Sequence, residues 1–232
     1  MSQFVFPAAP TPSVPVRGRD ARYAVSRIFC VGRNYAAHAR EMGSDPDREP
    51  PFYFTKPANA LIFNGAAIPY PPGTKNYHYE FELVIALGKP AYKIAVDKAL
   101  DTVWGYGAGL DMTRRDLQIA SRDIGRPWDF GKAFENSAVF GELVPAETIG
   151  HPGKGLIQLT VNGTVKQTGD LSDLIWSVPE VVSHLSQYYH LGPGDLIYTG
   201  TPERVGPVVP GDKLHGTIAG VGDLDVTIGK GD

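Results

Sequence analysis

Two glutamates separated by one residue, Glu80 and Glu82, stand at the start of an apolar run that ends at Leu87. In a β-strand, residues i and i+2 point to the same face, so both carboxylates are expected on one surface of a sheet, with residues 81, 83, 85 and 87 on the other. Two like charges held this close are unfavourable unless a proton or a cation lies between them. A hard divalent cation would resolve the repulsion. The alternative is a half-exposed strand with solvated acids, the common environment of charged residues.

Asp111 offers a third carboxylate, at the end of the glycine-rich run 104–111. The G-x-G-x-G spacing, without a βαβ unit and a ribose-binding acid, disfavours a dinucleotide site. Three carboxylates without clustered cysteine or histidine favour Mg²⁺ or Mn²⁺ over Zn²⁺. Asp111 could instead cap a helix that begins near Thr113, and these two roles remain open.

His38 and Glu41 lie three residues apart in a predicted short helix, 34–42, which Gly43 ends. At this spacing their side chains meet on one helix face. A carboxylate beside an imidazole orients it and raises its basicity, so the pair is a candidate general base for water. The alternative is a solvated helix face. Residues 44–51, with three prolines, are predicted to form a flexible loop, of the kind that often serves as a lid.

The composition limits the classes of partner. With 232 residues, a net charge of -3 and 20% charged residues, the chain has no broad basic field for nucleic acid. It has no stretch of 18 apolar residues and no signal-peptide pattern, so neither membrane insertion nor export is expected. The single cysteine, Cys30, fits a reducing cytoplasmic compartment. We expect Cys30 to be a buried strand residue rather than a nucleophile.

Short apolar runs punctuated by turn signals predict a strand-rich α+β fold without the alternating rhythm of a doubly wound sheet. Asn162-Gly163 predicts a type I′ hairpin, and a strand is predicted over 24–31. Residues 1–22 are proline-rich and are expected to be an extended arm, followed by a single catalytic domain, 23–232. Further helices are predicted at 96–101, 114–124 and 179–189.

Taken together, the candidate residues form an ordered set that resembles the fumarylacetoacetate hydrolase family. The set runs Val31-Gly32-Arg33-Asn34-Tyr35, His38 and Glu41, then Glu80 and Glu82, then Asp111 with Arg115, Asp116 and Gln118, then Lys132, then Thr199-Gly200-Thr201-Pro202. The likeness covers nearly the whole chain, 27–228. Within the family, the Gly-Arg-Asn-Tyr and Tyr-Thr-Gly-Thr-Pro segments are most similar to fumarylpyruvate hydrolases of gentisate degradation.

The resemblance implies a mixed β-sandwich roll, a homodimer and a metal-dependent hydrolase of carbon–carbon bonds. It implies that Glu80, Glu82 and Asp111 hold Mg²⁺ or Mn²⁺, and that His38 with Glu41 activates water on a lid helix. The residues that it places around the substrate are Arg115, Gln118, Lys132, Gly200 and Thr201.

The implied substrate is a small 2,4-diketo acid, or acylpyruvate. Hydroxide attack on its distal ketone breaks the C–C bond and leaves the pyruvate portion as an enolate, which a divalent cation stabilises. Lys132 would add a fixed positive charge, unless it is a surface lysine. A fumaryl group brings a second carboxylate, which suits the bidentate fork of arginine. The candidates are Arg33, Arg122 and Arg126, with Arg126 preferred.

Two other functions remain open. An oxaloacetate decarboxylase or a 2-oxo acid isomerase would use the same metal-bound enolate, and fold alone does not separate these activities. A noncatalytic, metal-stabilised binding protein would turn over no 2,4-diketo acid.

Overall fold

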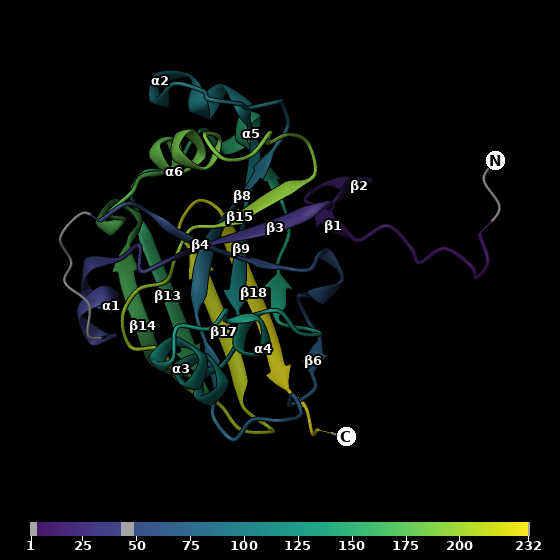
Figure 1. Cartoon of the computed structure of the whole chain (residues 1–232), viewed down its shortest axis with the longest axis vertical. Coiled ribbons are helices and arrows are strands. Elements are labelled where there is room, and N and C mark those ends of the chain that lie inside the picture. The colour runs from purple at the N-terminus through teal and green to yellow at the C-terminus, as the bar shows by residue number, and fades with distance from the viewer. Residues whose placement is uncertain (1–3, 43–48, 232) are drawn as a thin grey trace.

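Strands provide most of the regular structure, as the sequence predicted. The computed structural model describes residues 4–42 and 49–231, and Figure 1 shows long strands surrounded by short helices. Within these residues the strands form sheets of eight, five, three and two strands. This strand-rich, mixed β arrangement confirms the predicted fold class.

The eight-stranded sheet carries the residues of interest. It contains β3 (Arg27–Gly32), β4 (Phe52–Lys56), β5 (Leu61–Phe63), β8 (Phe81–Leu87), β9 (Val103–Asp111), β11 (Ala138–Phe140), β12 (Val144–Pro145) and β15 (Asp195–Tyr198). The strand order is β4-β3-β15-β8-β9-β11-β5, with β12 paired to β9 beside this path. β15 is parallel to β3 and β11 is parallel to β5, whereas the other neighbours are antiparallel.

Three smaller sheets complete the fold. The five-stranded sheet contains β6 (Ala67–Ile68), β13 (Leu156–Val161), β14 (Thr164–Asp170), β17 (Lys213–Ile218) and β18 (Gly222–Ile228), in the order β14-β13-β17-β18-β6. A three-stranded sheet joins β7 (Tyr77–Tyr79) to β10 (Thr113–Arg114) and β16 (Gly206–Pro207). The fourth sheet is a hairpin of β1 (Ser13–Val16) and β2 (Arg19–Ala24).

The helices are short. They are α1 (Ala36–Glu41), α2 (Val96–Ala99), α3 (Arg115–Asp123), α4 (Asp129–Lys132), α5 (Ala146–Ile149) and α6 (Val178–Leu185), with 3₁₀ turns η1 (Ala58–Ala60), η2 (Leu100–Thr102) and η3 (Leu171–Asp173). Each predicted helix is present, although α6 ends before residue 189. A capping box of Ser177 and Glu180 sets its start. The sequence analysis missed α4 and α5.

β8 is buried on both faces, and its alternation is the one predicted. Phe81, Leu83, Ile85 and Leu87 join a core that also contains side chains of the five-stranded sheet. Val84 and Ala86 point the other way, into a second cluster that includes residues of β1, β3 and β15. Because strand side chains alternate, Glu82 lies on the same face as Val84 and is covered.

The glycine-rich run forms β9 and serves close packing. A Cβ added at Gly109 would lie 2.7 Å from both the Tyr198 ring and the Val84 side chain. The run is therefore strand structure. Cys30 is buried in β3, as expected.

The N-terminal prediction needs a correction. Residues 4–12 contain no helix or strand, and Figure 1 shows them extending away from the body of the protein. Residues 13–24, however, form the β1–β2 hairpin, since Val14 and Val16 are buried against the large sheet. The extended arm is therefore shorter than 1–22.

Two loop predictions have different outcomes. Asn162 and Gly163 have φ values of +52° and +76°, as the predicted type I′ hairpin between β13 and β14 requires. The helix end at Gly43 and most of the predicted lid loop lie outside the described residues. No helix among the described residues is long and apolar enough to span a membrane.

Candidate active site

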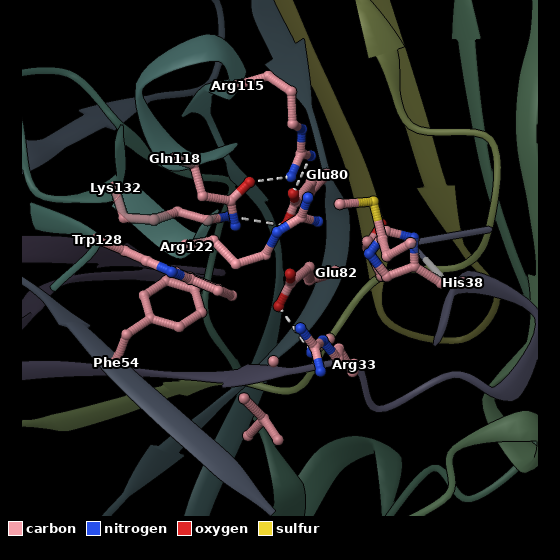
Figure 2. Close-up of a pocket in the computed structure, with 15 residues that line it drawn as sticks. Arg33, His38, Phe54, Glu80, Glu82, Arg115, Gln118, Arg122, Trp128 and Lys132 are labelled. Atoms are coloured by element: carbon pink, nitrogen blue, oxygen red, sulfur yellow. Dashed lines mark hydrogen bonds and ion pairs between the residues drawn. The ribbon is translucent and has the colours of Figure 1, made fainter. Parts of the chain in front are cut away.

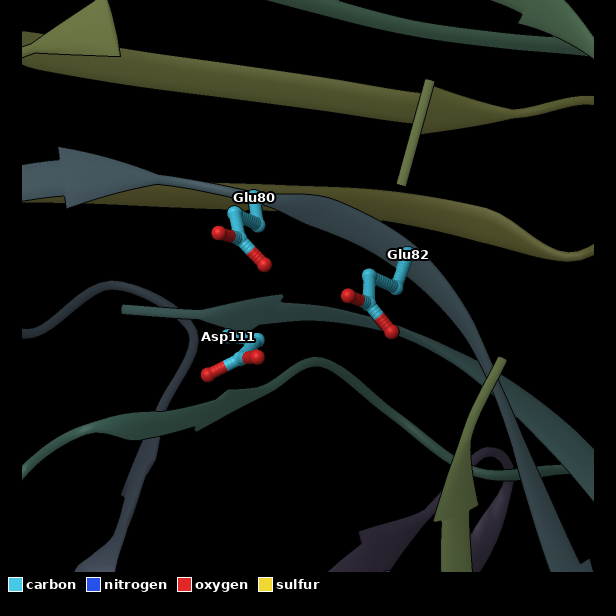
Figure 3. A group of neighbouring side chains, drawn as sticks. All are labelled: Glu80, Glu82 and Asp111. Atoms are coloured by element: carbon cyan, nitrogen blue, oxygen red, sulfur yellow. The ribbon is translucent and has the colours of Figure 1, made fainter. Parts of the chain in front are cut away.

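Glu80, Glu82 and Asp111 lie together inside the protein (Figure 3). Each offers a carboxylate oxygen, and these three atoms lie within 4.8 Å of one another. Sheet register brings them together, because Phe81 pairs with Leu110 and the Asp111 amide donates a hydrogen bond of 2.8 Å to the Glu80 carbonyl oxygen. Their side chains are buried, with residue exposures of 6%, 2% and 0%. The solvated-strand alternative is therefore wrong.

Asp111 caps no helix. The N-cap of α3 is Arg114, which makes no side-chain cap hydrogen bond. The two carboxylate oxygens of Asp111 instead contact two lysines: Oδ2 lies 2.7 Å from Lys132 Nζ, and Oδ1 lies 2.8 Å from Lys56 Nζ. Asp111 thus belongs to the acidic cluster.

Positively charged side chains surround the carboxylates. Lys132 Nζ lies 2.9 Å from Glu80 Oε2 and donates a hydrogen bond of 2.7 Å to Thr113 Oγ1. Arg115 donates to the other oxygen of Glu80 and to the Gln118 side-chain oxygen. Lys132 is almost fully buried, so the alternative of a surface lysine is wrong.

The three carboxylates differ in how well the protein stabilises their charge. Burial raises the pKa of Glu82 well above its usual range, and the nearby charges of Asp111 and Glu80 add to the shift. Burial also opposes ionisation of Glu80, but Lys132 and Arg115 outweigh it and hold the pKa of Glu80 below its usual value. Glu82 therefore carries the less compensated charge, which a cation among the carboxylates would relieve.

Gly200 ties the segment after β15 to Glu82. Its backbone amide donates a hydrogen bond of 2.8 Å to Glu82 Oε2. Gly200 has a φ of +102°, and a Cβ at this position would lie 2.8 Å from the Cβ of Asn34. Thr201 donates its hydroxyl to the carbonyl oxygen of Phe81 at 2.9 Å. Glycine is needed here for both its backbone conformation and its lack of a side chain.

A cavity adjoins the carboxylates. In Figure 2, His38 lies on one side of it, and Phe54, Trp128 and Lys132 lie on the other, with Glu82 between them. The other predicted site residues in its wall are Glu80, Arg33, Arg115, Gln118, Gly200 and Thr201. Residues from six separate parts of the sequence therefore meet around one space.

His38 and Glu41 meet as their spacing predicted. His38 Nδ1 lies 3.1 Å from Glu41 Oε2, and the exposed fraction of the His38 side chain is 7%. The Glu41 carboxylate also accepts the backbone amide of Arg204, at 3.0 and 2.9 Å. His38 thus faces the cavity with a fixed carboxylate partner instead of lying on a solvated helix face.

Arg126 is not brought to this cavity. Its side chain is exposed and lines a neighbouring cavity with Tyr53 and Asp129, while Phe54 and Trp128 border both spaces. The other two candidate arginines, Arg33 and Arg122, do line the cavity beside the carboxylates.

Some contributing residues were missed by the sequence analysis. Lys56 and Thr113 contact the acidic cluster, at Asp111 and Glu80 respectively, and Phe54, Trp128 and Met42 line the cavity. Lys56 had a visible signal, since it is a lysine at the end of the aromatic strand Phe-Tyr-Phe-Thr-Lys. The contacts of Thr113 depend on the position of Lys132, which local sequence does not reveal.

Most of the chain matches a single protein family. The model of the fumarylacetoacetate (FAA) hydrolase C-terminal domain matches residues 27–229. The chain belongs to the fumarylacetoacetate hydrolase family. The family resemblance inferred from the ordered site residues is therefore confirmed.

Individual members of this family are similar over most of the chain. A fumarylpyruvate hydrolase of Ralstonia sp is 52% identical over 190 residues, which cover 81% of this chain and 98% of that protein. The crystal structure of fumarylpyruvate hydrolase from Pseudomonas aeruginosa in complex with Mn²⁺ and pyruvate has a TM-score of 0.96 and 51% identity, and covers 98% of this chain and 100% of its own. A mitochondrial oxaloacetate tautomerase of Bos taurus is 41% identical and covers 84% of this chain and 87% of its own.

Gly200 provides a stability prediction with a matched control. Gly200→Ala and Gly211→Ala introduce a Cβ at similar positive φ values, but only Gly200 has a neighbouring atom within 4 Å. We expect both variants to lose about 1–2 kcal/mol from backbone strain, and Gly200→Ala to lose roughly 1–3 kcal/mol more from overpacking. Urea unfolding measures both losses, and equal losses would show that the close approach to Asn34 is unimportant.

Proposed function

We propose that this protein hydrolyses the carbon–carbon bond of a 2,4-diketo acid, and that its substrate is fumarylpyruvate, which yields fumarate and pyruvate. The observation that carries the proposal is one cavity lined by Glu80, Glu82 and His38, with Asp111 packed behind the two glutamates and Glu41 beside His38. The similar P. aeruginosa structure contains Mn²⁺ and pyruvate, the latter a product of the proposed reaction.

We propose that Glu80, Glu82 and Asp111 hold Mg²⁺ or Mn²⁺. The donor set fits such an ion, because it is buried, consists only of carboxylate oxygens, and leaves the charge of Glu82 poorly compensated. Bound there, the cation supplies Lewis-acid stabilisation of the negative charge on the departing pyruvate enolate.

His38 is the proposed base for the attacking water. With Glu41 beside Nδ1, the proton of the neutral ring resides on Nδ1, so Nε2 accepts a proton from water. The resulting oxygen nucleophile adds to the distal ketone carbon, and the bond between that carbon and the pyruvate methylene breaks. The electron pair of this bond forms the enolate, to whose carbon His38 returns the proton.

The remaining polar residues orient the substrate. Lys132 places a positive charge within 2.9 Å of two of the three carboxylates, where negative charge develops during cleavage. Arg115 and Gln118 are hydrogen-bonded to each other and line the cavity. Gly200 and Thr201, from a distant part of the sequence, line the same cavity. We propose that these residues fix the pyruvoyl end.

Arg33 is the proposed partner of the distal carboxylate. It lines the cavity and forms no hydrogen bond or ion pair with a described residue. The other cavity arginines already have acidic partners, because Arg115 pairs with Glu80 and Arg122 pairs with Asp123. Arg33 replaces Arg126 in this role, since Arg126 lies outside the cavity.

The domain boundaries, the oligomeric state and the cellular location are also proposed. We propose that residues 23–232 form one catalytic domain, against which the β1–β2 hairpin packs, and which exceeds the matched family region, 27–229, by a few residues at each end. We further propose a cytoplasmic homodimer that contributes to aromatic compound degradation. The buried, unpaired Cys30 is compatible with a reducing compartment.

Enolisation of oxaloacetate is a second candidate activity. It is favoured by the similarity to an oxaloacetate tautomerase over 84% of the chain. The same carboxylates, Lys132 and substrate contacts would serve it, but it needs no attacking water. The His38–Glu41 pair is therefore the feature that favours hydrolysis over this alternative.

The proposed function is tested by supplying fumarylpyruvate, acetylpyruvate and oxaloacetate in parallel. We expect loss of 2,4-diketo acid absorbance with Mn²⁺, formation of fumarate and pyruvate in equal amounts from fumarylpyruvate, and loss of turnover with a chelator. Turnover of oxaloacetate alone would contradict hydrolysis and favour the second candidate. Turnover of none would favour a binding protein.

His38→Gln tests the role of the base. We expect hydrolysis to slow by about 10²–10⁴-fold, the usual contribution of a general base, because Nε2 no longer accepts a proton from water. Reactions of oxaloacetate that need no water should be affected less. His190→Gln, at a histidine that stacks on Tyr92 outside the cavity, is the control. Hydrolysis at the wild-type rate in His38→Gln would remove His38 from the mechanism.

Arg33→Met tests recognition of the distal carboxylate. Loss of a charge-assisted contact should raise the KM for fumarylpyruvate about 10- to 100-fold. The KM for acetylpyruvate, which has no distal carboxylate, should change little. Arg126→Met serves as the matched control. A larger loss for Arg126→Met than for Arg33→Met would restore Arg126 to the role first expected from the sequence.

A further inference from the structure

Lys56 is a buried ammonium group directly behind the acidic cluster. It ends β4, and its side chain is 0% exposed. Its Nζ lies 2.8 Å from Asp111 Oδ1 and donates hydrogen bonds to the backbone carbonyl oxygens of Met112, at 3.0 Å, and Lys132. Two of these three contacts are hydrogen bonds, and the contact with Asp111 is an ion pair in which Oδ1 accepts no hydrogen bond. Lys56 does not line the cavity, so it has no route to the substrate.

Core packing does not explain a lysine at this position. Burial of an ammonium group costs several kcal/mol, which pairing offsets only when the surrounding geometry is good. A methionine would fill a similar volume without that cost. The partners of Lys56 instead come from two separate segments: Asp111 ends β9 and Met112 follows it, whereas Lys132 ends α4.

The two segments joined by Lys56 both carry groups of the proposed reaction. Asp111 is a proposed ligand of the cation, and Lys132 is the proposed positive charge near the enolate. Asp111 Oδ1 is held by Lys56, and its Oδ2 lies 2.7 Å from Lys132. One ammonium thus holds the carboxylate directly and holds the lysine through its backbone.

We propose that Lys56 is a positioning residue, which fixes Asp111 and the backbone of Lys132 relative to each other so that the cluster binds its divalent cation. This inference rests on the proposed metal role of Asp111. Without Lys56, the Asp111 carboxylate keeps its contact with Lys132 but loses the one at Oδ1, and two buried carbonyl oxygens lose a donor.

The direction of the change in metal affinity separates positioning from charge. If Lys56 acted only through its positive charge, its removal would tighten cation binding, because like charges repel. If it acts by positioning, its removal weakens binding, as loss of a residue that orients a metal ligand usually does. A purely structural role would leave the affinity unchanged and lower only the melting temperature.

The test is a calorimetric titration of Mn²⁺ into the full-length wild-type protein, Lys56→Met and the exposed control Lys89→Met. We expect Lys56→Met to weaken Mn²⁺ binding by about 10- to 100-fold and Lys89→Met to leave it unchanged. Equal or tighter binding in Lys56→Met would overturn the role of Lys56 while leaving the metal site intact. Absence of binding by the wild type would overturn the metal site and this inference together.

A second variant guards against misfolding. Lys56→Gln is neutral but retains amide donors for the carbonyl oxygens, so it should be more stable than Lys56→Met and still bind Mn²⁺ weakly. With saturating Mn²⁺, both variants should show a lower kcat for fumarylpyruvate, because Lys132 is displaced. Loss of the folded state in both variants, seen by circular dichroism, would make Lys56 a folding residue and overturn the proposal.

Discussion

The mutual repulsion of three buried carboxylates is the constraint around which the rest of the site is built. Glu80, Glu82 and Asp111 have ligand atoms within 4.8 Å of one another and have almost no access to water. Such a cluster is tolerated only when opposite charges are placed beside it. Lys132 and Arg115 provide these charges from the α4 and α3 region, and Lys56 provides another from β4. The carboxylates thus determine which segments must converge on them.

The pairing of β8 with β9 holds the carboxylates in fixed positions relative to one another. β8 is buried on both faces, so a slip by one residue would exchange its side chains between the two packed clusters and move Glu82 away from Asp111. Close packing at Gly109 and the amide of Gly200 restrict the neighbouring strands further. The rigidity that the core requires is therefore also the rigidity that the charged site requires.

Features that depend on interactions between adjacent residues could be predicted from the sequence. The alternation of β8, the Asn162-Gly163 turn and the spacing of His38 and Glu41 each depend on a few adjacent residues, and the structure contains all three. The ordered set of site residues added the family and its fold. The lysine that ends the aromatic strand was visible in the sequence, but the role of Lys56 was not, because its partners lie more than 50 residues away. Arg126 was favoured over Arg33 for a similar reason. Arg33 and Arg126 line two neighbouring cavities, and the residues adjacent to each arginine do not reveal which cavity it lines.

The contact between Glu41 and the backbone amide of Arg204 shows that the two halves of the site, the carboxylates and the His38–Glu41 pair, are held in different ways. The acidic half is part of the sheet and is lost only when the core unfolds. The basic half depends on a six-residue helix docked onto a segment 163 residues later in the chain, through the same carboxylate that orients His38. Undocking of this helix requires only local opening, which is less costly than global unfolding. The orientation of His38 therefore depends on a contact that local opening would break, whereas the positions of the carboxylates depend on the sheet.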